Sequence, residues 1–428
     1  MSNEVANQIS VDQLRVGVYV YLDVGWMHHP FNFNNFKIRT EEQLATIQGL
    51  GLGLVRWDPA RSDIKPLAKS EISGAAAVPQ VPTQESEAAK AELARLMAVK
   101  EERIRKQAEH RQKIEKVERA FANAAAVIKG VNKSIYAQPQ QAMADTAQLI
   151  AGMVDELLGA PDLAIQVMAD KPGNEDVYLH SLNVSVLAMV LGKEMNMPAE
   201  LIKLVGSASI FHDIGLNDVP DRILHATGPL TKAEREFREL HTQYGFDLAR
   251  KIGLPVSVAN IVAQHHELYD GSGYPKRLKG DAIDPLARLV CVINAYDNLC
   301  NPVQVANAMT PHMALSSMFA QQRSQFDVRF LQAFIKFMGV YPPGTLVGLS
   351  NDAIGLVVRV NSKRPLRPTV IVYDAGVPKS EAMMLDLDEE PDINITKAYK
   401  PSQLPQSVYE YLAPRKRVNY YFDAGAGA

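Results

Sequence analysis

Apolar residues recur at helical spacing through most of residues 141–340, and short segments that contain glycine or proline interrupt them. The pattern predicts helices over residues 145–158, 177–194, 199–212, 232–252, 257–267 and 286–299. The breaks at residues 213–220 and 270–275 are typical of connections between packed helices. We therefore expect an all-α domain over residues 141–340.

The two ends of the chain carry a different pattern. β-branched and aromatic residues at 18–22, followed by a helical stretch at 41–48, predict a small α+β module over residues 1–68. Residues 69–88 are rich in Ala, Ser, Pro, Glu and Gln without an apolar face, which predicts a linker. β-branched runs at 355–360 and 368–373 predict a β-rich extension over residues 341–428. The expected fold class is mainly α.

One apolar stripe runs along residues 89–140, which we expect to form a long connecting helix. Its members alternate at steps of three and four residues: Ile114, Val117, Phe121, Ala124, Ile128, Val131 and Ile135. Such a stripe packs either on the following helices of its own chain or on a second copy in a parallel homodimer. Residues 100–119 carry thirteen charged side chains of both signs, which is typical of a solvated helix face.

Composition and charge exclude several classes of protein. The 428 residues are 47% hydrophobic, which is typical of an ordinary globular protein. The formal net charge of −3 gives no overall positive potential, so we expect no nucleic-acid polymer as partner. Two cysteines do not suffice for a disulfide framework. No run of 18 apolar residues and no signal-peptide pattern occur, so we expect a cytoplasmic protein without a membrane span.

Histidine and aspartate gather in the predicted helical domain. Six of the ten histidines lie between residues 180 and 266. Taken singly, a histidine at a helix C-terminus is explained by the helix dipole. An aspartate on an apolar helix face is harder to explain, because a buried carboxylate is costly without a cation. The candidate residues are His180, His212, Asp213, His241, His265, His266 and Asp297.

Together these five imidazoles and two carboxylates fit a compact site for two divalent metal ions, with Asp213 suited to bridge them. Fraying of the helix end at Ile214 and Gly215 would let both His212 and Asp213 turn inward. Two such ions activate a water and offset the charge on a phosphate ester, so hydrolysis of a phosphodiester is the expected reaction. Asp176, one helical turn before His180, is a candidate to orient that imidazole.

The ordered set His180, His212-Asp213 and Asp297 resembles the metal-dependent HD phosphohydrolase superfamily. His241, the pair His265-His266 and the segment HHELYDGSGYP that this pair opens resemble its HD-GYP subgroup. The resemblance implies an all-helical HD-type domain and a bacterial signalling enzyme that hydrolyses cyclic di-GMP to linear pGpG or GMP. It also implies two divalent ions, iron or manganese, with magnesium, nickel or zinc as alternatives.

Residue roles follow from the same resemblance. It makes the seven candidates the metal ligands, with Asp213 also catalytic. It makes Tyr274 and Asp176 substrate-binding residues. Aspartate at 176, where three-metal relatives carry glutamate, favours two ions. The Gly273-Tyr274-Pro275 loop would be a structural element near the site or a docking element for diguanylate cyclase (GGDEF) domains, with an ordinary Gly/Pro turn as the alternative. The segment WMHHPF at residues 26–31 resembles a poorly characterised domain that precedes HD-GYP in some bacterial proteins.

Two departures from the family pattern keep an alternative open. Leu216 stands where the family usually has a lysine, and residues 298–311 carry no basic side chain. Loss of such phosphate contacts attenuates binding, so the alternative is a weak or inactive member that acts as a metal- and nucleotide-binding scaffold. The candidates to replace the missing cations are Arg222, Arg250, Arg288 and Arg323. Another cyclic dinucleotide or a nucleotide monophosphate as substrate is a further alternative.

Overall fold

The structure is a computed structural model. It describes residues 7–24, 28–31, 34–68, 84–159, 164–167, 176–226, 228–304, 307–361, 364–375, 377, 379, 382–412 and 420–423. The chain forms two compact units, one of Met1–Arg111 with Ser350–Ala353 and Val372–Met383, and one of Gln112–Leu349 with Ile354–Ile371 and Met384–Ala428. The fold class is mainly α with a small sheet toward each end, as the sequence predicts.

The N-terminal sheet has four strands in the order β1-β4-β2-β3, all antiparallel. Its core includes Val18, Val20, Ile38, Ile47 and Val55, which are at most 1% exposed. Thr40 caps the N-terminus of the helix α1 (Glu41–Gly49) by accepting a hydrogen bond from the N–H of Gln43. The elements are β1 (Asn7–Ser10), β2 (Tyr19–Tyr21), β3 (Asn35–Lys37), α1 (Glu41–Gly49) and β4 (Leu54–Trp57).

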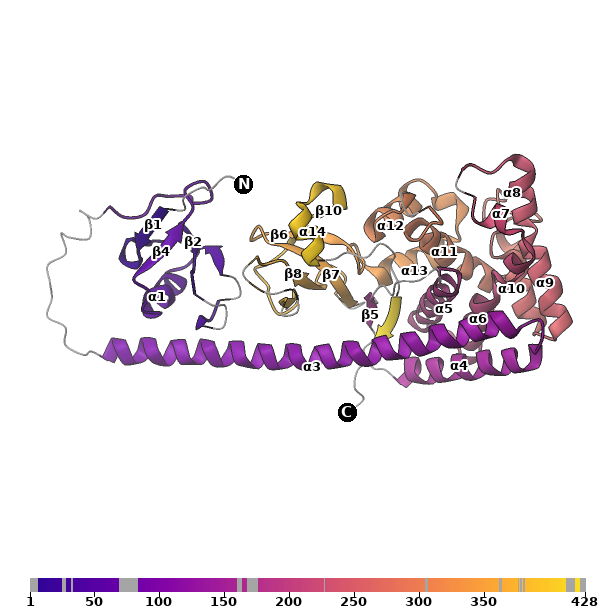
Figure 1. The fold of residues 1–428 in the computed structure, drawn as a ribbon, viewed down its shortest axis with the longest axis horizontal. Helices are drawn as coiled ribbons and strands as arrows, with labels where there is room; N and C mark the ends of the chain where they lie inside the picture. Colours follow the sequence, from indigo (N-terminus) through magenta and orange to yellow (C-terminus); the bar gives the residue numbers. More distant parts are fainter. Residues whose placement is uncertain are drawn as a thin grey trace. The chain divides into compact units, whose positions relative to one another are not determined.

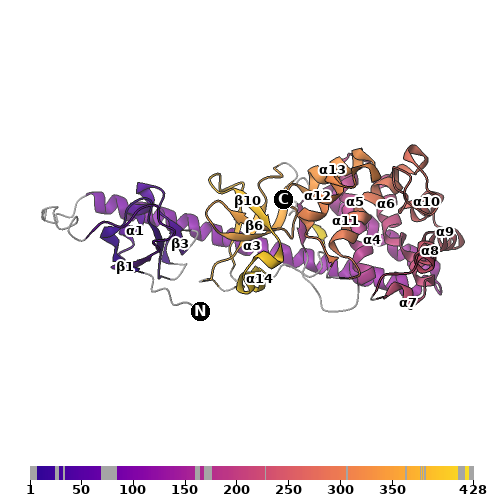
Figure 2. The same cartoon turned by 90° about the horizontal axis from the view of Figure 1, so that it is seen from above.

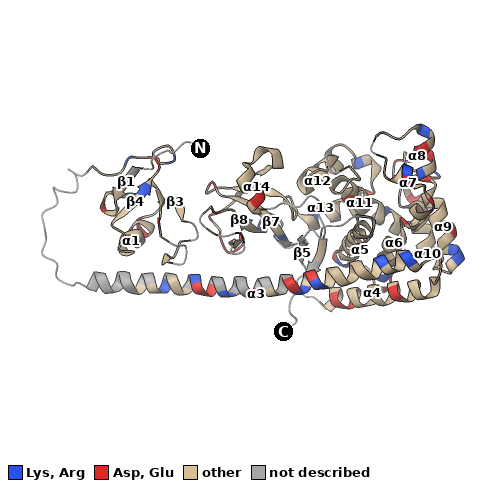
Figure 3. Ribbon diagram, in the orientation of Figure 1, with Lys and Arg blue, Asp and Glu red and all other residues tan. Residues whose placement is uncertain are grey.

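The long helix α3 (Gln84–Ser134) carries the apolar stripe, and α4 (Pro139–Gly159) follows it. From Val117 to Ile135 every member of the stripe is buried in the core cluster of the second unit. The side chain of Ile114 lies outside the described residues. The described charges along α3 are of both signs (Figure 3). The chain itself therefore covers the stripe, and the homodimer stays a prediction.

The helical domain is built around α5 (Asp176–Glu194), whose residues 181–192 are all buried. A helix that is apolar on all sides belongs in a core, and α5 packs against α6, α11 and α13 (Figures 1 and 2). The other helices are α6 (Ala199–Phe211), α7 (Asp221–Leu224), α8 (Lys232–Glu239), α9 (His241–Ile252), α10 (Val256–Gln264), α11 (Pro285–Cys300), α12 (Pro311–Ala320) and α13 (Val328–Met338). The 3₁₀ helix η3 (Ile214–Asp218) connects α6 to α7.

One predicted helix is wrong in detail. The segment 232–252 forms two helices, α8 and α9, because the N–H of Leu240 bonds to the carbonyls of Phe237 and Arg238 instead of continuing the α-helical ladder. Arg238 is thereby placed just before the end of a helix, and His241 begins the next one. The short-range periodicity alone does not reveal this break.

The C-terminal sheet has seven strands within the described residues, in the order β10-β6-β7-β5-β11, with β8 and β9 attached through β7. Its strands are β6 (Leu346–Leu349), β7 (Ile354–Asn361), β8 (Thr369–Val372), β9 (Met384–Asp386), β10 (Ile395–Tyr399) and β11 (Tyr420–Asp423), joined by β5 (Ala164–Val167) from the chain before α5. A short helix, α14 (Gln406–Leu412), precedes β11. Strand β11 pairs with β5 and also packs on α5, so the last described strand contacts the helical domain.

Within the described residues, no helix combines the length and the apolarity that crossing a bilayer requires.

Candidate metal centre

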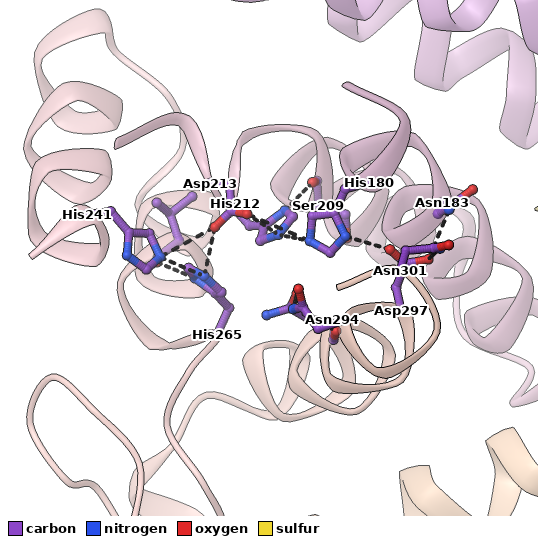
Figure 4. A network of polar contacts seen from close by, with 12 residues as sticks. His180, Asn183, Ser209, His212, Asp213, His241, His265, Asn294, Asp297 and Asn301 are labelled. Carbon is purple, nitrogen blue, oxygen red and sulfur yellow. Dashed lines mark hydrogen bonds and ion pairs between the residues drawn. The ribbon is translucent and has the colours of Figure 1, made fainter. Parts of the chain in front are cut away.

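Four imidazoles converge on Asp213, which follows the end of α6 (Figure 4). Oδ1 of Asp213 lies 3.3 Å from Nε2 of His241 and 3.5 Å from Nε2 of His265. Its Oδ2 lies 3.4 Å from Nε2 of His212 and 3.7 Å from Nε2 of His180. The helix ends at Phe211 and Asp213 leaves the helical conformation (φ −100°, ψ 9°). Fraying was expected at Ile214 and Gly215, but these residues begin the 3₁₀ helix η3.

Helix ends orient three of these rings. His212 and His265 each follow the last residue of a helix. His241 follows Leu240, the residue that caps the C-terminus of α8. The last carbonyls of a helix have no intrahelical partner. Each Nδ1–H donates 2.7 Å to the carbonyl three residues earlier, on Ser209, Arg238 or Val262. This bond fixes the tautomer, so Nε2 offers its lone pair toward Asp213.

The converging atoms form two groups that share Asp213. One contains His180, His212 and Asp213, and the other contains Asp213, His241, His265 and His266, with the ligand atoms of each group within 4.8 Å of one another. A carboxylate with one oxygen toward each group is the arrangement that holds two cations close together. The structure therefore has a His/Asp cluster able to bind metal.

Burial sets the charge state of this cluster. It lowers the pKa of His265 to about 4 and that of His266 well below its ordinary value, so both rings are neutral, as metal ligands must be. Burial acts to raise the pKa of Asp213. The surrounding imidazoles, His212 above all, outweigh it and hold the pKa of Asp213 well below its usual range.

Asp297, on α11, lies on the other side of His180 from Asp213. Its Oδ2 accepts the Nδ1–H of His180 at 2.6 Å, and its Oδ1 accepts the amides of Asn183 and Asn301, each at 2.9 Å. Burial opposes protonation of His180, but this carboxylate raises the pKa of His180. The structure thus places Asp297 outside the two groups and in contact with the first through His180.

Close packing of glycines brings Asp213 to His241. A Cβ on Gly215 would lie 2.0 Å from the carbonyl oxygen of His241 and 2.5 Å from the N of Gly245. Gly245 is restricted as well, though less severely, since its Cβ would meet the side chain of Val262 at 2.8 Å. No side chain fits between η3 and α9, and this contact sets the spacing of the second group.

The loop after His266 is held by a buried carboxylate. Glu267 is 1% exposed and accepts the N–H groups of Lys276 and Leu278 at 2.7 and 2.8 Å. A Cβ on Gly273 would lie 2.4 Å from the carbonyl oxygen of His266. Tyr274 therefore reaches the site, where its ring stacks on that of His266 at 4.6 Å between centroids.

A cavity of about 450 Å³ opens beside the second group and is lined by Asp213, His241, His266 and Tyr274. Leu216 lines it at the position where a lysine was expected. Arg235 and Arg238 of α8 also line it, and sequence analysis missed both. The only available signal was their spacing, i and i+3 on the helix that leads to His241.

The four arginines proposed from the sequence lie elsewhere, and this expectation is wrong. None of them, all in the described residues, lines the cavity. Arg288 is 6% exposed and paired with Asp281 and Asp327, Arg222 pairs with Glu234, and Arg323 stacks on Phe319. Arg250 is exposed on α9.

Asp176 begins α5, but its side chain lies outside the described residues, so its predicted role stays a prediction. The same holds for Trp26 and Met27 of the N-terminal motif.

Three family models match successive parts of the chain. Residues 6–146 match a domain of unknown function, DUF3391, residues 140–330 match an HD domain, and residues 346–407 match a KOW domain associated with HD domains. The order agrees with the resemblance that the N-terminal motif and the histidine pattern indicate.

Relatives cover the chain to different extents. A Pseudomonas aeruginosa protein named cyclic di-GMP phosphodiesterase PA4108 is 27% identical over 98% of this chain and 99% of its own length. The cyclic di-GMP phosphodiesterase response regulator RpfG of Xanthomonas campestris is 30% identical over 39% of this chain and 44% of its own. A 3'3'-cGAMP-specific phosphodiesterase 2 of Vibrio cholerae is 31% identical over 32% and 26%. Residues 140–330 of the chain therefore form an HD domain, between a segment that matches DUF3391 and a segment that matches a KOW domain associated with HD domains.

Proposed function

We propose that this protein is a metal-dependent phosphodiesterase that hydrolyses cyclic di-GMP. The observation that carries the proposal is Asp213, whose two oxygens face two groups of imidazoles. The names of the relatives that match the whole chain and its HD domain support the same reaction. The expected product is a linear guanine nucleotide, either pGpG or GMP.

The donor set fits two divalent ions. Neutral imidazoles with fixed Nδ1–H groups and a shared carboxylate suit iron or manganese, and also nickel or zinc. His180, His212 and Asp213 would hold one ion. Asp297, which the resemblance makes a further ligand, lies outside this group and contacts it through His180. Asp213, His241, His265 and His266 would hold the other. When bound, the ions supply a nucleophilic hydroxide near neutral pH and offset charge on a phosphate oxygen.

The remaining residues of the cavity bind and orient the substrate. Arg235 and Arg238 are exposed cations, and the guanidinium group is the side chain best matched to phosphate oxygens. A second cavity, of about 300 Å³, shares Leu230, Arg238 and Asn298 with the first. Two adjoining cavities with an arginine common to both suit a dinucleotide, which presents two phosphates and two bases.

These arginines also bear on the scaffold alternative. That alternative rests on the missing cations at Leu216 and residues 298–311, and the two guanidinium groups supply cations to the same cavity from α8. We therefore favour the enzyme. Tyr274 is proposed to contact the substrate, and docking of diguanylate cyclase domains on its loop stays a prediction.

A turnover assay tests the proposal. Full-length protein loaded anaerobically with Mn²⁺ or Fe²⁺ is incubated with cyclic di-GMP, 3'3'-cGAMP and cyclic di-AMP, and products are separated by chromatography. We expect linear product from cyclic di-GMP with the highest kcat/KM, and no product from Asp213→Asn. A wild-type protein that binds metal and nucleotide without turnover would establish the scaffold instead. Preferred turnover of 3'3'-cGAMP would change the substrate and keep the reaction.

A further inference from the structure

The chain's last described strand is connected to the metal centre by three hydrogen bonds. The backbone N–H of Tyr420 donates to Oδ1 of Asn183 at 3.0 Å, and the amide of Asn183 donates to Oδ1 of Asp297 at 2.9 Å. Oδ2 of Asp297 accepts the Nδ1–H of His180 at 2.6 Å. Figure 4 shows the part of this path from Asn183 to His180. Residue 420 thus contacts, through side chains of α5 and α11, a residue of the first metal group.

The path is buried from Tyr420 to Asp297. Tyr420 and Asp297 are 0% exposed and Asn183 is 1% exposed, so water does not replace a missing partner. Tyr420 is itself fixed, because β11 pairs with β5 and its hydroxyl bonds to that of Tyr296 at 2.8 Å. Tyr296 immediately precedes Asp297 on α11. The strand is therefore a rigid element beside the carboxylate.

The direction of the bonds matters because an asparagine amide has two different ends. The N–H of Tyr420 can only meet the oxygen of Asn183, which turns the NH₂ group toward the carboxylate of Asp297. Loss of that donor removes a bond that fixes the orientation of the Asn183 amide, and a rotated amide would face Asp297 with an acceptor. A carboxylate held in one orientation keeps the proton of His180 on Nδ1 and leaves Nε2 for a cation.

We propose that Asn183 and the backbone of β11 are positioning groups for the first metal ion, so that the C-terminal strand completes the metal centre of the helical domain. The inference rests on the proposed metal site, and it gives the C-terminal extension a role in that site. Neither residue contacts the substrate cavity. Both act on the cation through Asp297 and His180.

Mn²⁺ binding to the full chain, measured by calorimetric titration, tests the role of Asn183. We expect two ions on the wild type, and on Asn183→Ala a 10- to 100-fold weaker binding of one ion with the other unchanged. Excess Mn²⁺ should restore turnover of this variant without a change in KM. Ser185→Ala is the matched control, because Ser185 lies two residues along α5, is 0% exposed and loses one buried bond, to the carbonyl of Gly206. It should bind both ions as the wild type does.

A second pair of variants isolates the backbone donor. Tyr420→Ala removes the side chain and keeps the N–H, whereas Tyr420→Pro removes both. We expect Tyr420→Pro to bind one ion at least tenfold more weakly than Tyr420→Ala does. Wild-type binding of both ions by Asn183→Ala, or the same loss in Ser185→Ala, overturns the proposal even if Tyr420→Pro fails to fold. A wild type that binds both ions but does not cleave cyclic di-GMP contradicts only the proposed function.

Discussion

The Nδ1 atom of His180 lies 2.6 Å from Oδ2 of Asp297, and Nε2 of the same ring lies 3.7 Å from Oδ2 of Asp213. One imidazole therefore lies between two carboxylates. Its tautomer decides to which of them the ring donates a hydrogen bond. In the Nδ1–H tautomer the ring donates a hydrogen bond to Asp297 and leaves Nε2 for a cation. The first metal group depends on this choice.

Asp297→Asn should remove that choice. Asn183 and Asn301 both donate to Oδ1 of Asp297, so the oxygen of an asparagine at 297 would face them and its NH₂ group would face His180. The ring must then accept at Nδ1 and carry its proton on Nε2, where it blocks a metal. We expect a fall in kcat of roughly 100-fold or more and loss of one bound Mn²⁺. Two tightly bound ions in this variant would show that the tautomer argument is wrong.

Gly215→Ala tests the contact between η3 and α9. The added methyl group would lie 2.0 Å from the carbonyl oxygen of His241, so the two segments must separate. We expect a loss of stability of about 1–3 kcal/mol and weaker metal binding, because Asp213 moves away from His241. Chemical denaturation and Mn²⁺ titration measure the two effects. Gly152→Ala on α4, where a Cβ meets nothing within 4 Å, is the control and should leave both unchanged or raise stability.

Arg238→Ala and Arg235→Ala should separate substrate binding from metal binding. Each removes a charge-assisted contact to phosphate, which is worth about 1.5–3 kcal/mol, so kcat/KM should fall by roughly 10- to 150-fold. Bound metal should stay at two ions. Arg250→Ala is the matched control, since Arg250 is exposed on α9 and does not line the cavity. Equal kinetic effects in all three variants would contradict a specific role for α8.

Glu267→Gln should loosen the loop that carries Tyr274. The carboxylate accepts two backbone N–H groups, and an amide offers only one acceptor and turns a donor against the second N–H. We expect a cost of about 1–3 kcal/mol and faster hydrogen exchange at Lys276 and Leu278. Unchanged exchange at both amides would argue against this account of the loop.

The sequence predicts most helices of the helical domain and the types of side chain at the metal centre. Helical periodicity identifies α4, α5, α6, α10 and α11, and the histidine pattern identifies the side chains that meet at Asp213. Both signals depend only on residue type and spacing, so they can be recognised without knowledge of the tertiary contacts. Spacing alone leaves two partners for the apolar stripe equal; the structure shows the stripe buried within its own chain, and pairing with a second copy stays a prediction.

Other features depend on contacts that spacing does not encode. Arg235 and Arg238 look like any exposed face of a charged helix until the break at Leu240 and the cavity are known. Asn183 is one polar residue in an apolar helix, and its partner Tyr420 is more than two hundred positions away. The tyrosine-rich end of the chain carries no signal that it enters the helical domain.

The number of ions bound by the wild type and by Asp213→Asn tests the central claim most directly. Elemental analysis of anaerobically purified, Mn²⁺-loaded protein should give two ions per chain for the wild type. Because one carboxylate serves both groups, the single substitution should lower this number to one or none and abolish turnover of cyclic di-GMP. Two ions in both proteins, or none in the wild type, would contradict a metal centre built around Asp213.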